Sequence, residues 1–331
     1  MMPFAYSKPA DIEAAVRLAG PDARFIAGGT NLLDLMKENV AQPRRLIDIT
    51  GLPLREVSET AAGGLLVGAL VGNAELARHP RIEADYPLLS QAILAGASPQ
   101  LRNMASSGGN LLQRTRCPYF YDTGTPCNKR EPGSGCSART GLNRNHAIFG
   151  ASEHCVATHP SDMCVALAAL AATVHVQGRQ GTRQIAFADF HRLPGNEPER
   201  DNCLSDDELI TGIELPAPRF AEHVHYLKVR DRASYAFALV SVAAALTLDG
   251  DRIGELRLAL GGVAHKPWRQ PDLEARFQGQ PATADTYAEI ARVMMSGAQP
   301  LAHNAFKVTL AHNAIIRALG TAQQRQSGAT S

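Results

Sequence analysis

Four of the six cysteines in this sequence lie within one loop-like stretch and can together bind a metal. They are Cys117, Cys127, Cys136 and Cys155, in a segment rich in Gly, Pro, Asn and Ser. Four thiolates are the ligand set of a 4Fe–4S cluster or of a structural zinc ion. The spacing C-x9-C-x8-C-x18-C has neither the close pairs typical of zinc sites nor the tighter runs of ferredoxins. Spacing alone therefore leaves a cluster, a zinc ion and unligated cysteines open.

Neighbouring side chains suit a negatively charged cluster. Aromatic residues at positions 119–121 can shield it from water, which also tunes its potential. The other two cysteines are not predicted to bind the metal, because Cys164 lies in an apolar helical pattern and Cys203 lies in a polar loop. We expect Cys164 in the core and Cys203 to be incidental. Cations close in sequence can offset the charge of the cluster, namely Arg114, Arg116, Lys129, Arg130 and Arg139.

Two Gly-Gly turns offer a second kind of chemistry, the binding of phosphate. The first, at residues 27–31, joins a strand pattern to a helix pattern, and the second lies within residues 101–110. Glycines let the backbone approach a ligand closely, and N–H groups at a helix start can hold an anion. Neither turn is a Walker A loop or a GxGxxG fingerprint. The pair can clamp the pyrophosphate of a dinucleotide, and the alternative is two ordinary strand–helix turns.

A third polar cluster, residues 158–162, ends at Asp162 directly before a helical pattern. Asp162 is a credible N-cap of that helix. Its carboxylate can equally bind a ribose or ribityl hydroxyl.

These motifs must be positioned by an α/β framework, because helical and strand periodicities alternate along the first half of the chain. After the cysteine stretch, a helix–strand pair, a surface loop at 192–202 and a strand at 210–216 lead to a boundary near 217–222. The C-terminal part predicts a hairpin turning at Asp249-Gly250-Asp251, two helices at 284–297 and 302–320, and a frayed tail. The expected N-terminal helices are 11–20, 31–39 and 75–97, the last broken at Pro80 and Pro87, and the strands are 23–30, 44–49 and 63–71.

Composition bounds the class of protein. The chain has 331 residues, 45% hydrophobic and 20% charged, with a net charge of +1. This length predicts at least two domains, and the charge gives no field that favours nucleic acid or an anionic membrane. No apolar run predicts a membrane span, and the N-terminus lacks the pattern of a secretion signal. No hydrolytic motif is visible either.

Taken together, these segments resemble the FAD-binding subunit of the molybdenum hydroxylases over nearly the whole chain. AGGTNLLDLMK (27–37) and LRNMASSGGNLL (101–112) are similar to the family's two FAD loops. HPSD (159–162) and KVRDRASYAFALVSVAAAL (228–246) are similar to its aspartate segment and to the start of its C-terminal domain. The cysteine stretch resembles one branch, the FAD and iron–sulfur subunits of bacterial periplasmic aldehyde oxidoreductases.

The resemblance implies an α+β fold of the vanillyl-alcohol-oxidase (PCMH) type, with FAD between two subdomains. A C-terminal domain like that of the carbon monoxide dehydrogenase flavoprotein would follow, with a three-stranded sheet and helices. We expect the FAD-binding domain at 1–218, with the iron–sulfur insert at about 115–156. The C-terminal domain is expected at 219–325 and a flexible tail at 326–331.

The implied activity is electron transfer within an oxidoreductase, with FAD and a 4Fe–4S cluster as cofactors and no catalytic side chain in this chain. A large partner would hold the molybdenum cofactor and oxidise an aldehyde. A small partner would hold two 2Fe–2S clusters, and electrons would leave from FAD to an external acceptor. The resembling subunits are periplasmic, exported with a partner's signal; without such export the chain would be cytoplasmic.

The resemblance also implies the site residues. Each of the four cysteines named above would bind one iron, with Tyr121 packed between cluster and flavin. Backbone N–H groups of the first loop would hold the pyrophosphate, with side-chain contacts from Thr30 and Asn31. The FAD ligands expected are Ala27, Gly28, Gly29, Thr30, Asn31, Leu32, Leu33, Ser106, Gly109, Asn110, Asp162 and Lys228.

Two other interpretations stay open. One is a stand-alone FAD-dependent oxidase or dehydrogenase of the same fold with its own substrate pocket. The other is a non-catalytic module in which zinc clips the cysteine loop for docking. A flavin spectrum with a broad absorption near 400 nm would favour the electron-transfer subunit, and a colourless zinc protein would favour the docking module.

Overall fold

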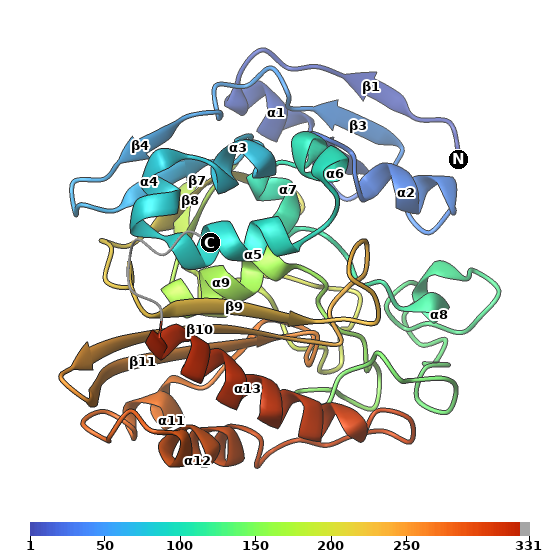
Figure 1. Ribbon diagram of the computed structural model, residues 1–331. Helices are drawn as coiled ribbons and strands as arrows, with labels where there is room; N and C mark the ends of the chain where they lie inside the picture. Colours follow the sequence, from blue (N-terminus) through green and yellow to red (C-terminus); the bar gives the residue numbers. More distant parts are fainter. Residues whose placement is uncertain (325–331) are drawn as a thin grey trace.

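Three sheets organise the chain, and the computed structural model describes residues 1–324 of it (Figure 1). The N-terminal sheet is parallel, with the order β1 (Ala5–Ser7), β3 (Arg45–Asp48) and β2 (Ala23–Ile26). Crossover connections carry α1 (Ile12–Leu18) and α2 (Leu32–Lys37), as parallel strands require. Asp11 begins α1 by accepting the N–H of Ala14 at 2.6 Å. The predicted β–α–β alternation is present here.

The second sheet is antiparallel and draws its strands from both sides of the cysteine stretch. Its order is β4 (Val57–Glu59), β5 (Leu65–Gly68), β8 (Leu209–Leu215), β6 (Thr173–Gly178) and β7 (Gly181–Ala186). Pro80 and Pro87 each occupy the first turn of a new helix. The expected breaks are therefore real. The helices of this part are α3 (Asn73–Ala77), α4 (Pro80–Asp85), α5 (Pro87–Ala95), α6 (Pro99–Met104), α7 (Ser107–Leu111), α9 (Asp162–Leu170) and α10 (Phe187–Phe190).

The C-terminal sheet has the order β12 (Trp268–Arg269), β11 (Arg252–Gly261), β10 (Val240–Asp249) and β9 (Val224–Val229). Three strands were expected, and the additional β12 has only two residues. The predicted hairpin joins β10 to β11, with Gly250 in the left-handed region at φ 61°. The helices that follow are α11 (Pro271–Ala275), α12 (Ala284–Met294) and α13 (Phe306–Gln324).

Strand β10 is buried on both faces, which fixes how the two halves of the chain pack. Val242 and Leu246 belong to the core shared with α12 and α13. Ala243 and Ala245, on the opposite face, belong to the core shared with α5 and α9. This alternation follows from the two-residue period of a strand. The small alanines let α9 lie close to the sheet.

The cysteine stretch leaves the body between α7 and α9 and contains one short helix, α8 (Pro118–Tyr121). In Figure 1 it forms the green loops at the side of the molecule. At the C-terminus, α13 continues through Gln324, so residues 320–324 are helical rather than frayed. The tail expected at 326–331 lies outside the described residues. Among the described helices, none combines the length and apolar character needed to cross a bilayer.

Candidate functional site

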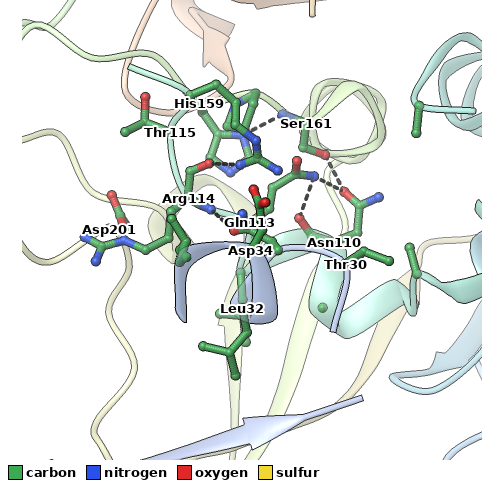
Figure 2. Close-up of a pocket in the computed structure, with 18 of the residues that line it drawn as sticks. Thr30, Leu32, Asp34, Asn110, Gln113, Arg114, Thr115, His159, Ser161 and Asp201 are labelled. Carbon is green, nitrogen blue, oxygen red and sulfur yellow. Dashed lines mark hydrogen bonds and ion pairs between the residues drawn. The ribbon is translucent and has the colours of Figure 1, made fainter. Parts of the chain in front are cut away.

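The polar motifs singled out above line one cavity of about 1300 Å³. Its wall includes residues 27–32 of the first Gly-Gly turn, Ser106, Gly109 and Asn110 of the second, and the segment 158–163. Strand β9 adds Lys228, and the cysteine stretch adds Cys117 and Tyr121. Figure 2 shows Thr30, Asn110 and Ser161 converging from separate elements on the same space. The fold therefore brings together segments up to 200 residues apart.

The first turn depends on its two glycines. A Cβ on Gly28 would lie 1.7 Å from the carbonyl oxygen of Met104, so this backbone touches the end of α6 directly. Gly29 has φ +70°, a conformation that glycine adopts without strain. Within the described structure, no hydrogen bond engages the N–H groups of Gly28, Gly29, Thr30 or Asn31. These N–H groups are available to an anion.

Two residues of this turn already have partners. The N–H of Leu33 donates to the carbonyl oxygen of Gly29 at 3.1 Å, and the residue does not line the cavity. The Asn31 side chain accepts the Arg114 N–H at 2.8 Å and donates to the Tyr121 hydroxyl at 3.4 Å. Asn31 therefore ties the turn to the start of the cysteine stretch. The N–H of Leu33, which was expected to bind a ligand, is therefore already engaged.

The second turn is held to the third polar cluster. Ser106 begins α7 by accepting the Gly109 N–H at 3.2 Å. Asn110 accepts through Oδ1 from the Ser161 hydroxyl at 2.5 Å and from Gln113 at 2.9 Å. Figure 2 shows these side chains facing one another. This network fixes the distance between the second turn and α9.

A buried ion pair joins the third cluster to the C-terminal sheet. Asp162 accepts from Lys228 Nζ at 2.8 Å and from the Tyr226 hydroxyl at 2.7 Å. The side chains of Asp162 and Lys228 are only 7% and 4% exposed. The N-cap of α9 is Ser161, which accepts the Cys164 N–H at 3.0 Å, and not Asp162 as the sequence suggested. The carboxylate is instead turned toward β9, where only tertiary structure could bring it.

The four cysteines gather beside the cavity. Cys127 and Cys136 face each other in an isolated antiparallel bridge. Cys117 and Cys155 both lie within electrostatic reach of Cys127. All four are free thiols. Cys164 is fully buried in α9, apart from this group, as expected of a core residue.

Burial raises the pKa of the Cys117 thiol to about 12 and that of Cys155 to about 11. Backbone N–H groups nevertheless point at the sulfurs, those of Phe120 and Tyr119 at Cys117 and that of Ala157 at Cys155. N–H donors favour a thiolate, and a coordinating metal would supply the missing positive charge. The donor set therefore fits a metal centre held by four thiolates.

A polar anchor that the sequence did not reveal joins the cysteine stretch to the cavity. Asp201 accepts from Arg114 Nε at 2.7 Å and from the Lys129 ammonium. His265 Nε2 lies 3.8 Å from the same carboxylate. The loop at 192–202 was expected at the surface, but its end at Asp201 packs against the cysteine stretch. Its only sequence signal was a carboxylate in a polar loop, which is too common to single out.

A second group of potential metal ligands uses some of its ring nitrogens in hydrogen bonds, while His159 Nε2 and His191 Nδ1 have no partner in the described structure. His159, Cys164 and His191 are buried, with ligand atoms within 4.8 Å of one another. His159 Nδ1 accepts the Ser161 N–H at 3.3 Å, so its proton sits on Nε2. His191 Nε2 bonds the Leu111 carbonyl at 2.9 Å. Binding a metal through His159 Nε2 would require its proton to move to Nδ1, which would break the hydrogen bond from Ser161.

Comparison with known sequences gives the family of both parts of the chain. The FAD binding domain in molybdopterin dehydrogenase matches residues 2–218. The CO dehydrogenase flavoprotein C-terminal domain matches residues 225–322. Together they confirm the expected fold class.

The similarity to individual relatives extends over almost the whole chain. The aldehyde oxidoreductase FAD-binding subunit of Escherichia coli is 53% identical over 305 residues, covering 92% of each protein. The glyceraldehyde dehydrogenase medium chain of Sulfolobus acidocaldarius is 27% identical, covering 90% of this chain and 89% of that one. A chain of quinoline 2-oxidoreductase from Pseudomonas putida has 25% identity and a TM-score of 0.75, with 98% of both chains covered.

We predict that Gly28→Ala destabilises the protein by about 3 kcal/mol, at the upper end for overpacking. The new methyl group meets a backbone carbonyl, which cannot move aside as a flexible side chain would. Denaturant unfolding measures the effect, and flavin content should fall with it. Gly20→Ala is the control, because nothing lies within 4 Å of a Cβ there. Equal stability of the two variants would contradict the close approach of the loops.

We predict that Lys228→Met costs about 3–5 kcal/mol of unfolding free energy, because it leaves the Asp162 carboxylate buried without its cation. The double variant Asp162→Asn/Lys228→Met removes both charges and should be more stable than Lys228→Met alone. Denaturant unfolding of the wild type, both single variants and the double variant completes the cycle. Strictly additive effects would show that the pair does not interact.

Proposed function

This chain belongs to the family of FAD-binding medium subunits of molybdenum hydroxylases, and on that premise we propose that it is an electron-transfer subunit of an aldehyde oxidoreductase complex. It would hold FAD and a 4Fe–4S cluster and pass electrons from partner 2Fe–2S clusters to an external acceptor. The observation that carries the proposal is the single cavity on which both Gly-Gly turns, Asp162, Lys228 and Cys117 converge. The 53% identity to a subunit of an aldehyde oxidoreductase supports the substrate class.

The cavity's residues fit FAD, which when bound supplies a group that accepts and releases electrons. We propose that the free N–H groups from Gly28 to Asn31, and the side chain of Thr30, hold the pyrophosphate. Asn110 and its neighbours Ser106 and Gly109 would bind it from the second turn. Asp162 would accept from a hydroxyl of the ligand, and Lys228 would orient that carboxylate. These side chains bind and orient, and none needs to transfer a proton.

The likeness of the cysteine stretch to that of iron–sulfur subunits favours a 4Fe–4S cluster over a zinc ion. The spacing of the four cysteines also lacks the close pairs that are typical of structural zinc sites. A 4Fe–4S cluster takes one thiolate at each of its four irons. We therefore propose Cys117, Cys127, Cys136 and Cys155 as the four iron ligands.

The partners follow from the family. We propose a heterotrimer with a large subunit that carries the molybdenum cofactor and a small subunit that carries two 2Fe–2S clusters. The likeness of the cysteine stretch to that of periplasmic aldehyde oxidoreductases supports the periplasm as the compartment, reached through a partner's export signal. Fractionation of the native host, followed by molybdenum, iron and flavin analysis of the purified complex, tests both points.

We predict that serine at any one of the four cysteines lowers the iron content and the broad absorption near 400 nm. Loss of one thiolate leaves one iron without its protein ligand. Cys164→Ser is the matched control, because Cys164 is a buried cysteine of α9 outside the group. Iron analysis and visible spectra of the five purified variants give the result. Equal iron in all five would rule out this ligand set.

The stand-alone oxidase makes a different prediction. If the chain had its own substrate site, aldehydes would reduce the flavin of the purified chain in the absence of any partner. We expect no such reduction in anaerobic spectra of the isolated subunit, and full reduction once the molybdenum subunit and the 2Fe–2S subunit are restored.

A further inference from the structure

Lys129 is a buried cation inside the cysteine stretch. It lies two residues after Cys127, and its side chain is 1% exposed. Its ammonium donates to the Asp201 carboxylate and, at 2.6 Å, to the carbonyl oxygen of Pro198. Taking an ammonium out of water costs several kcal/mol, and an ion pair seldom repays more than that cost. Stability alone therefore gives no reason for a lysine here.

Asp201 balances more than one cation. Its second oxygen accepts from Arg114, whose guanidinium lies 4.8 Å from the centre of the Phe120 ring. The two cations hold the pKa of Asp201 well below its usual range, against the effect of burial, so the carboxylate is charged. Burial lowers the pKa of the nearby His265 to about 3, so that imidazole carries no charge at neutral pH. The group Arg114, Lys129 and Asp201 has a net charge of +1.

This charge acts directly on the cysteines. The Lys129 ammonium lies within electrostatic reach of the Cys155 sulfur and favours its thiolate. Phe120, under the Arg114 guanidinium, packs in the same small core as Cys127. Charges buried this way interact far more strongly than charges in water. An electron added to the four-thiolate centre would be stabilised by Lys129 and opposed by Asp201.

We propose that Lys129 and Asp201 are tuning residues that set the reduction potential of the centre held by the four cysteines, Lys129 raising it and Asp201 lowering it. The inference rests on the proposed cluster and deepens it. A tuning role of this pair differs from a purely structural role in one measurable respect. Removing either member of a purely structural pair would loosen the loop in the same way, whereas removing opposite charges shifts the potential in opposite directions.

The test is a redox titration of the purified complex, followed by the visible and EPR signals of the cluster. Lys129→Met should shift its midpoint potential downward and Asp201→Asn should shift it upward, relative to the parent. Lys129→Arg keeps the charge and should stay near the parent value. Arg139→Gln is the control, because Arg139 is an exposed cation of the same stretch whose charge is screened by solvent.

Shifts of the same sign in both variants, or none in either, would overturn the proposal. If Lys129→Met fails to assemble the cluster, the other two variants decide. An upward shift in Asp201→Asn with a near-parent potential in Lys129→Arg supports the proposal, and any other result defeats it. A parent complex that contains no iron bound by this chain would refute the proposed function itself, which separates the two failures.

Discussion

The ion pair between Asp162 and Lys228 is the interaction on which the site depends, because it crosses between the two halves of the chain. Asp162 begins α9, and Lys228 lies on β9 of the C-terminal sheet. Burial of the pair is tolerable only because each member has a further hydrogen bond. The Tyr226 hydroxyl donates to Asp162, and Lys228 donates to the carbonyl oxygen of Ala95. Once α9 is fixed against β9, Ser161 stands beside the second Gly-Gly turn. The cavity is thus shaped by a polar contact that spans the two main cores.

The cysteine stretch has no comparable core of its own. Its small apolar cluster centres on Phe120 and Cys127, together with Leu35 from α2. Segments that bury so little apolar surface rely on staples such as a metal or a disulfide. The four thiols are free, and the buried Lys129–Asp201 pair positions the stretch rather than adding net stability. A bound cluster would add the strongest staple, which connects the folding of this stretch with its proposed chemistry.

Local signals in the sequence predicted local structure well, and contacts across the fold poorly. Pro80 and Pro87 start helices, and Gly250 turns a hairpin, because each acts through its own backbone. Asp162 lines the cavity, but of the two roles offered for it the capping role belongs to Ser161, since both residue types cap helices equally well. Asp201 went unnoticed because its partners lie 87 and 72 residues away. No periodicity or motif in the sequence predicts a contact between residues so far apart in the chain.

Three titratable groups at the cavity are poorly suited to act as a general base. A general base works best with a pKa near the operating pH. Burial lowers the pKa of His146 to about 4 and that of His159 well below its usual value, so both imidazoles stay neutral and are weak bases. Asp162 is already paired with Lys228. Lys307, whose pKa falls to about 7 through burial, donates to the carbonyls of His146 and Gly262 and does not line the cavity. In the proposed function, these cavity residues bind and orient, and the proton chemistry of aldehyde oxidation belongs to the molybdenum subunit.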